Sequence, residues 1–341
     1  EDCSKWVDST FKFVQIGFWY IMKQLPSVNS EIEDELIDKI FKNNFDILSP
    51  FFLKLMSEWT IGAYRVFKDI DTYTILIYLI SKQFDFYRRN NLNITYNNFY
   101  KDKSLEIEKI NLINISKDLQ IPKESVRRKV LTLEKNGIIK KKGKKFSIDR
   151  SAYNSTQPID TLKNISALLS VFSKILKDEK VVKNEMSSYE INSLIKSNFS
   201  FCWYQFYKFL FPYCLRWKIY FGDMEIFTIL ATIILNNNSR INRQLKGIDS
   251  YLQKWRNQII NQKIKGINAM SISEITGIPR PTVVRKIQIL TKNKFISLDK
   301  NKLINFDVSN KNFKEMSKIQ DENLRSLNDF IKRTFNQINL N

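Results

Sequence analysis

Apolar residues recur at helical spacing along most of the chain. In two stretches, residues 115–148 and residues 272–306, they predict a short helix, a tight turn, a longer helix and a hairpin. In the longer helix of the first stretch, Val126, Val130 and Leu133 fall at positions i, i+4 and i+7, so they share one face. Because that face must be buried, we expect the opposite face of the helix to point to solvent.

Each stretch ends in two short apolar runs separated by a polar tip, which is typical of a β-hairpin. The tips read K-K-K-G-K-K over residues 140–145 and S-L-D-K-N-K over residues 297–302. Gly143 and Asn301 are the residue types that adopt positive φ at such a tip. The pattern therefore predicts a mostly α-helical fold that carries two small β-hairpins.

The two stretches resemble each other, since 11 of 25 positions are identical when residues 115–139 are aligned with residues 272–296. The similarity extends upstream, where the segments around Pro50 and Pro212 also match. A long internal repeat of this kind is typical of a duplicated domain. The organisation that we expect is a first repeat at 1–150 with its unit at about 115–149, a second repeat at 151–309 with its unit at about 271–307, and a C-terminal helix at 310–341.

The motifs Ile121-Pro122-x2-Ser125-Val126-x-Arg128 and Ile278-Pro279-x2-Thr282-Val283-x-Arg285 are each followed by an apolar helix face and a hairpin. This arrangement resembles the winged helix-turn-helix superfamily, in particular the MarR-like, GntR-like and CRP-like bacterial regulators. The resemblance covers about 35 residues per copy, and the hairpin lacks the Asp-x-Arg of the MarR pattern. It implies that the longer helix enters the major groove of DNA while the hairpin, or wing, lies along the backbone or minor groove.

The candidate DNA-binding residues lie on the outward helix faces and in the hairpins of the two copies. In the first copy they are Lys123, Glu124, Ser125, Arg127, Arg128, Lys129, Lys140, Lys141, Lys142, Lys144 and Lys145. In the second copy they are Arg280, Thr282, Val284, Arg285, Lys286, Lys300 and Lys302.

Comparison of the copies separates two expected roles. Positions that both copies share suit phosphate anchoring or placement of the helix, which carry no sequence information; these are Ser125/Thr282, Arg128/Arg285 and Lys129/Lys286. Positions that differ suit base readout, because Arg or Lys favours guanine and an apolar side chain favours the thymine methyl; these are Lys123/Arg280, Glu124/Pro281 and Arg127/Val284.

The charge distribution favours double-stranded DNA as the partner. The chain has a formal net charge of +20, although its many Lys, Asn and Ile residues are also typical of an AT-rich genome. Codon bias acts uniformly, yet residues 1–58 hold 6 Lys and 10 Asp and Glu, whereas residues 117–150 hold 12 Lys and Arg and 4 Asp and Glu. A local phosphate-binding surface accounts for that contrast. The alternative is that the lysine-rich hairpin is simply a solvated loop.

The composition argues against catalysis. The chain contains no histidine, which excludes His-based acid–base chemistry and most zinc sites, and it contains no Walker loop or G-x-G-x-x-G motif. Its three cysteines, Cys3, Cys202 and Cys214, fit free thiols in a reducing cytosol. We therefore expect no enzymatic activity, no cofactor and no metal. The apolar runs are too short to span a bilayer, so we also expect no membrane partner and a cytoplasmic, nucleoid-associated location.

Two DNA-binding units in one chain predict a covalent pseudo-dimer. Regulators of this kind usually pair two chains, whose recognition helices reach half-sites about one DNA turn, ~34–36 Å, apart. Here one chain supplies both helices, as a monomeric pseudo-dimer or within a homodimer. Helices expected at 10–25, 161–176 and 310–338 are candidates for the seam between the halves.

The function that we expect is sequence-specific transcriptional regulation by occupancy of a DNA site. A plasmid-type or phage-type replication initiator with tandem winged helices is one alternative. A structural or interaction protein that uses winged helices to bind protein is another. An unidentified small-molecule effector is a further candidate partner. Aromatic residues that either line its pocket or pack the core are Phe18, Trp19, Tyr20, Trp203, Tyr204, Phe206 and Tyr207.

Overall fold

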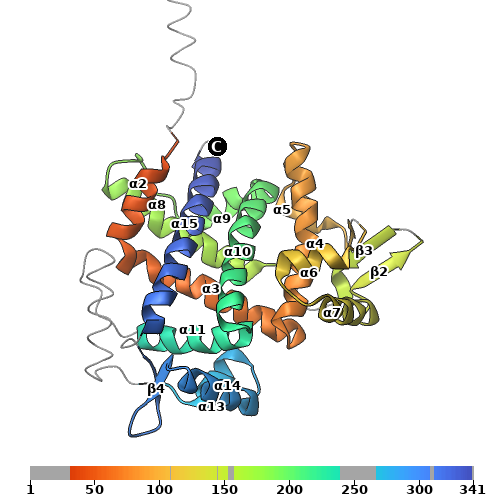
Figure 1. Ribbon diagram of the computed structural model, residues 1–341. Helices are drawn as coiled ribbons and strands as arrows, with labels where there is room; N and C mark the ends of the chain where they lie inside the picture. Colours follow the sequence, from red (N-terminus) through yellow and green to blue (C-terminus); the bar gives the residue numbers. More distant parts are fainter. Residues whose placement is uncertain are drawn as a thin grey trace, which may run out of the picture.

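The computed structural model describes residues 31–107, 109–143, 145–152, 157–238, 266–307 and 311–339. This part of the chain is mostly helical and carries two small antiparallel sheets, as expected (Figure 1). The helices up to residue 150 are α2 (Asp34–Asn43), α3 (Phe45–Phe67), α4 (Ile70–Arg89), α5 (Tyr96–Lys101), α6 (Leu112–Leu119) and α7 (Lys123–Lys135). The later helices are α8 (Ile159–Asp178), α9 (Ser188–Ser197), α10 (Phe199–Phe221), α11 (Met224–Asn238), α13 (Ala269–Thr276), α14 (Arg280–Lys292) and α15 (Lys311–Asn339).

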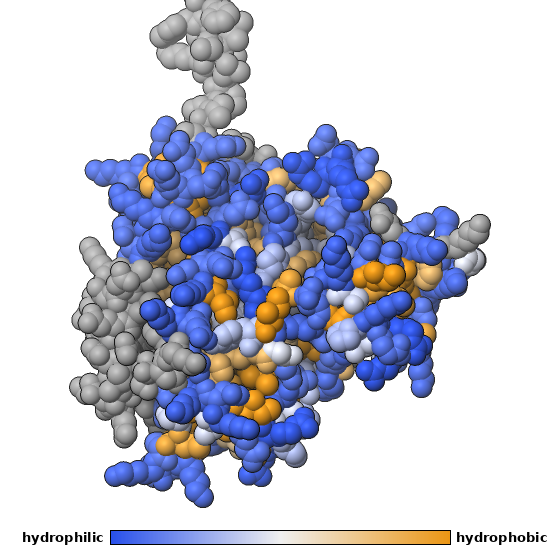
Figure 2. Space-filling view, viewed as in Figure 1, coloured by the Kyte–Doolittle hydropathy of each residue, from blue (hydrophilic) through white to orange (hydrophobic). Residues whose placement is uncertain are grey.

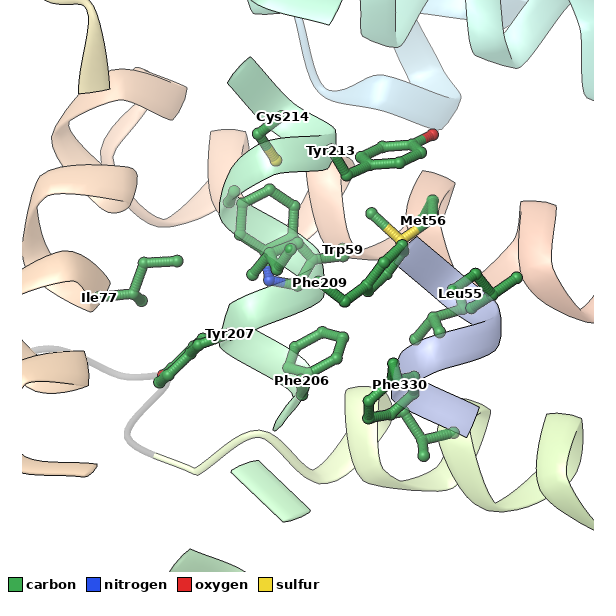
Figure 3. Packing of buried hydrophobic residues seen from close by; sticks show 14 of the residues in the cluster. Leu55, Met56, Trp59, Ile77, Phe206, Tyr207, Phe209, Tyr213, Cys214 and Phe330 are labelled. Atoms are coloured by element: carbon green, nitrogen blue, oxygen red, sulfur yellow. The ribbon is translucent and has the colours of Figure 1, made fainter. Parts of the chain in front are cut away.

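Four long helices from both halves of the sequence form the centre of the molecule. α3 and α4 pack against each other and against α10 and α11. About half of the residues of α3 and of α10 are buried, and α3 keeps one exposed stripe that includes Lys54, Glu58 and Arg65. Figure 3 shows Phe206 and Phe209 of α10 packed between Met56 of α3 and Phe330 of α15. The two halves therefore share one hydrophobic core, and the expected boundary near residue 150 divides the sequence rather than the core.

α8 and α15 each contact both halves of the chain. α8 packs on α3 and α9, while α15 packs on α10, α2 and α9. The Asn336 side chain accepts a hydrogen bond from Ile32 N at 3.2 Å, and the Arg216 guanidinium donates to Asn323 Oδ1 at 2.9 Å. Helices were expected at 161–176 and 310–338, and α8 and α15 lie there; their role as a seam stays a prediction. The expected helix at 10–25 lies outside the described residues.

The first sheet contains β1 (Ser104–Ile107), β2 (Ile139–Lys142) and β3 (Lys145–Asp149) in the order β1-β3-β2. The second contains β4 (Ile296–Leu298) and β5 (Ile304–Phe306), and the isolated bridge of Ile267 to Ile304 occupies the place that β1 has in the first sheet. β1 was not expected from the sequence. The positive φ at the first hairpin tip falls at Gly143, as expected, but the positive φ in the second loop falls at Lys302 and not at Asn301.

The expected match of the segments around Pro50 and Pro212 was wrong in register. Pro50 is the sixth residue of α3, whereas Pro212 is the fourteenth residue of α10. Instead, the first and last residues of α3 lie 154 residues before the first and last residues of α10. Asn44 and Asn198 each end one helix, begin the next and donate a side-chain hydrogen bond to a carbonyl four residues earlier.

Among the described residues, no single helix is long and apolar enough to cross a bilayer. α10 and α11 have the length and apolar composition of a membrane span only when they are taken together, and the chain bends by 98° at the break between them.

Candidate nucleic-acid interface

Two helix-turn-helix-hairpin units lie at the periphery of the helical body, and their hairpins point away from each other (Figure 1). The first unit comprises α6, α7 and the sheet β1-β3-β2, and the second comprises α13, α14, β4 and β5. In both units the turn is built by the same contacts. Ser116 Oγ donates to the carbonyl of Ile121 at 2.7 Å, and Ser273 Oγ donates to that of Ile278 at 2.7 Å.

The backbone of the two turns also agrees. The short helices end in the left-handed region at Gln120, with φ 50°, and at Gly277, with φ 74°. Pro122 and Pro279 follow as N-caps with φ near −51° and −54°, a value that the pyrrolidine ring favours and that leads the chain into the next helix. Equivalent contacts thus recur in the two units at a separation of 157 residues.

The turns present the arginines of both longer helices to solvent. Val126, Val130 and Leu133 bury one face of α7, and Val283, Ile287 and Leu290 bury the same face of α14. On the outward side of each helix, most of the expected base-reading and phosphate-anchoring positions are exposed; these are Lys123, Glu124, Arg127, Arg128, Arg280, Val284 and Arg285. Ser125 and Thr282 are half-buried.

The arginines of the first unit differ in their surroundings. Arg127 forms a bidentate ion pair with Glu124, with Nε 2.9 Å from Oε2 and Nη2 2.7 Å from Oε1. The hydrogen bond from Arg127 lowers the pKa of Glu124. Arg128 Nη2 donates to Ser125 Oγ at 3.3 Å. In the second unit, neither Arg280 nor Arg285 has a carboxylate partner among the described residues.

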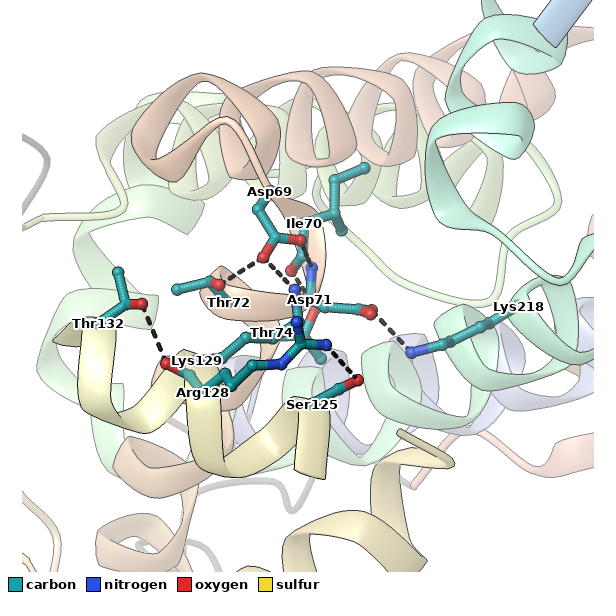
Figure 4. A network of polar contacts seen from close by, with 10 residues as sticks. All are labelled: Asp69, Ile70, Asp71, Thr72, Thr74, Ser125, Arg128, Lys129, Thr132 and Lys218. Carbon is teal, nitrogen blue, oxygen red and sulfur yellow. Dashed lines mark hydrogen bonds and ion pairs between the residues drawn. The ribbon is translucent and has the colours of Figure 1, made fainter. Parts of the chain in front are cut away.

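Lys129 and Lys286 do not point outward. Of the two roles expected for the shared positions, their ion pairs fit helix placement and not phosphate anchoring. Lys129 Nζ forms an ion pair with Asp69, which also accepts from Thr72 (Figure 4). Lys286 Nζ lies between Asp223 and Glu225, the latter at 3.1 Å, and only 6% of its side chain is exposed. The physical reason is helical phase, because each lysine directly precedes a buried residue and faces the carboxylates at the N-terminus of the neighbouring scaffold helix.

Asp69 and Asp223 are functional residues that the sequence reasoning missed. Asp69 is the N-cap of α4, and Asp223 accepts from Glu225 N at 2.7 Å at the start of α11. Each therefore caps a scaffold helix and holds the longer helix of a unit at the same time. Burial alone would raise the pKa of Asp69, but hydrogen bonds from Lys129 and Thr72 outweigh it and lower that pKa. The sequence does hold a signal for these residues, because an aspartate followed two residues later by a second acidic residue occurs at both places, as Asp69-x-Asp71 and Asp223-x-Glu225.

The lysines of the first wing are partly neutralised. Lys140 pairs with Asp149 at 2.6 Å, and Lys145 pairs with Glu106 of β1 at 3.0 Å. Lys141 lies 5.6 Å from the ring centroid of Phe146. Lys142 is exposed and has no ion-pair partner in the described part of the chain, whereas Lys144 lies outside it.

The second wing carries less charge. Lys300 and Lys302 are both exposed. The Asp299 carboxylate organises the loop, since it accepts from Asn301 N at 2.9 Å and from Leu303 N at 2.8 Å.

The helical body anchors both units through polar contacts. Arg65 of α3 donates to the carbonyl of Ile275 at 2.7 Å, so a helix of the first half contacts the second unit directly. Lys218 of α10 pairs with Asp71 of α4 at 2.7 Å, beside the Asp69–Lys129 contact (Figure 4). The second unit is thus bonded directly to a helix of the first half, whereas α10 reaches the first unit through α4.

An open groove runs beside each longer helix. The groove beside α7, of about 480 Å³, has polar walls that include Lys68, Thr72 and Thr132. The groove beside α14, of about 710 Å³, has Ile226 and Ile289 in place of the two threonines. Figure 2 shows apolar surface in the region where α11 lies against α14.

The aromatic residues of α10 pack the core. Trp203, Phe206 and Tyr207 are buried and Tyr204 is half-buried. The cavity that the first three border, of about 130 Å³, is smaller than the ~300–1,000 Å³ typical of ligand pockets. Phe18, Trp19 and Tyr20 lie outside the described residues. A small-molecule effector therefore stays a prediction.

Reactive groups are few among the described residues. No cluster of His, Cys, Asp and Glu suited to a metal ion occurs there. Cys202 and Cys214 are buried free thiols, as expected, and burial raises the pKa of Cys202 to about 12. Cys3 lies outside the described part.

No family model, curated protein or solved structure matches this chain.

Proposed function

We propose that this chain is a sequence-specific double-stranded DNA-binding protein of the winged helix-turn-helix type, which regulates transcription by occupying its site and has no reaction of its own. α7 and α14 act as recognition helices in the major groove, and the β2-β3 and β4-β5 hairpins act as wings along the backbone. The protein works in the cytoplasm on the nucleoid.

One observation carries the proposal. α7 and α14 follow equivalent proline-led turns, bury the same face and leave Arg128 and Arg285 exposed at equivalent positions. These two helices have equal length, and each is followed by a hairpin with exposed lysines. Each helix with its hairpin could therefore bind one segment of a DNA duplex.

The recurrence of contacts supports a duplicated chain, or pseudo-dimer. Three kinds of contact occupy equivalent places in the two units: the ion pairs Lys129–Asp69 and Lys286–Asp223, the turns at Ser116 and Ser273, and the strand contacts of Ile107 and Ile267. Since the central helices of both halves share one core, one chain would hold both recognition helices in a fixed relation. The outward residues of α7 and α14 differ, so the operator should have two unequal half-sites.

Fluorescence anisotropy with duplexes selected from random DNA tests the proposal. Arg128→Ala and Arg285→Ala should each weaken binding by on the order of 1–3 kcal/mol if the side chain contacts a base. Lys42→Ala, on the exposed surface of α2, removes one positive charge far along the sequence from either unit and serves as the control. Failure of the wild-type chain to bind any duplex at low salt would overturn the proposal, as would equal losses in all three variants.

A further inference from the structure

The ion pair between Glu124 and Arg127 lies on the exposed face of α7, where a DNA contact would form. Three hydrogen bonds join the two groups: Arg127 Nε lies 2.9 Å and 3.1 Å from the two carboxylate oxygens, and Nη2 lies 2.7 Å from Oε1. Both side chains remain more than half exposed, at 52% for Arg127 and 64% for Glu124. The equivalent residues of α14 are Pro281 and Val284, so the second unit has no such pair.

The pair changes what Arg127 is able to bind. A guanidinium has five N–H donors, and the contact with Glu124 engages Nε and one edge of Nη2. The remaining donors point away from the carboxylate. A phosphate that approached them would also approach the negative charge of Glu124, and that repulsion opposes the attraction to Arg127.

A base edge does not carry that penalty. The N7 and O6 atoms of guanine are acceptors for arginine, and the N4 amino group of cytosine is a donor to a glutamate carboxylate. Glu124 and Arg127 therefore present acceptor and donor groups side by side, and a G·C pair carries groups complementary to both. The neighbouring Arg128 has no carboxylate partner among the described residues and is left for phosphate or a second base.

We infer that Glu124 is a specificity-determining residue, which together with Arg127 selects a G·C base pair in the half-site that faces α7 and weakens binding to other DNA. This inference rests on the proposed function. The half-site that faces α14 would lack the requirement, because Pro281 and Val284 offer no hydrogen-bonding side chain.

Selection from random DNA, repeated with the wild-type chain and three variants, tests the inference. The variants are Glu124→Gln, Arg127→Ala and the control Glu134→Gln. Glu134 lies on the same helix and its change removes the same charge, but it forms no ion pair in the described part of the chain. The half-site that faces α14 serves as an internal reference in every selection.

The wild-type selection should contain one G·C position in one half-site that both Glu124→Gln and Arg127→Ala lose. Glu124→Gln should also bind unselected duplex more tightly than Glu134→Gln does. The ratio of affinities for duplexes with G·C or A·T at that position should fall about 5- to 150-fold in Glu124→Gln, since a bidentate base contact discriminates by about 1–3 kcal/mol.

Three results would overturn the inference. An unchanged motif in Glu124→Gln would show that the carboxylate does not read the base. Equal changes in Glu124→Gln and Glu134→Gln would reduce the effect to net charge. If the wild-type chain retains no duplex at all, the proposed function fails as well, which distinguishes that outcome from the other two.

Discussion

Replacement of Lys286 by methionine separates a structural role for this lysine from a DNA-binding one. The lysine side chain is 6% exposed and its Nζ is shared by Asp223 and Glu225 at the start of α11. Methionine keeps the length and apolar stem of the side chain but removes its charge. Two carboxylates would then face each other without a counter-ion, next to the packing contact between α11 and α14.

The expected cost follows from the burial of the three groups. Loss of one partner from a fully buried ion pair costs about 3–5 kcal/mol, because the remaining charge stays desolvated. Asp223 and Glu225 are 38% and 25% exposed, so water screens part of the repulsion. We therefore expect Lys286→Met to lower the free energy of unfolding by about 2–3 kcal/mol.

The equivalent substitution in the first unit is the matched control. Lys129 is 22% exposed and, within the described ranges, pairs with one carboxylate, that of Asp69, so Lys129→Met should cost less, about 1 kcal/mol. Urea unfolding followed by circular dichroism measures both values from the midpoint and slope. The triple variant Lys286→Met, Asp223→Asn, Glu225→Gln should recover much of the lost stability, since no unpaired charge remains and asparagine still caps a helix.

The contrary result is equally clear. A lysine that contacts phosphate contributes about one to the salt slope of DNA binding. If Lys286→Met left the stability unchanged and reduced that slope, the assignment of Lys286 to the scaffold would be wrong.

Further predictions concern the wing, acid stability and two glycines. Lys142→Gln should weaken binding to all duplexes about equally and reduce the salt slope by about 1, as titrations at several salt concentrations would show. Hydrogen bonds hold the pKa of Asp69 below its unfolded value of about 3.9 despite burial. Its contribution to stability is therefore complete above that pH and is lost as the pH falls further. Asp69→Asn should flatten this acid dependence, as urea unfolding at about pH 2 to 5 would show. Gly266→Ala would place a Cβ 2.7 Å from the Ile304 carbonyl oxygen and should cost about 1–3 kcal/mol. Gly62→Ala should stabilise α3 by ~0.5–1 kcal/mol, because the new Cβ meets no atom within 4 Å beyond the adjacent backbone of its own helix. Thermal unfolding would check both.

The two helix-turn-helix-hairpin units could be predicted because their signals are local. Apolar spacing, the turn residues and the proline at the start of the longer helix all lie within about 20 residues of one another in each unit. Those signals predicted the buried face of α7 and the exposure of Arg127 and Arg128, which the structure has. They also predicted Gly143 at the first hairpin tip.

Contacts between distant segments could not be predicted in the same way. β1 has only two inward residues, Leu105 and Ile107, and pairs with a strand about 40 residues later, so no local pattern indicated it. Helical spacing places Lys129 and Lys286 near the edge of the outward face, and only the position of α4 and α11 decides that they turn inward. The alignment of Pro50 with Pro212 gave the wrong register because both prolines lie inside helices, so neither one marks where its helix begins or ends.

The most direct test of two recognition helices in one chain is a hydroxyl-radical footprint of the wild-type protein on a duplex selected from random DNA. We expect two protected segments of different sequence for each bound chain, one lost in Arg128→Ala and the other in Arg285→Ala. A single protected segment, two segments of identical sequence, or the absence of any protected duplex would contradict the account.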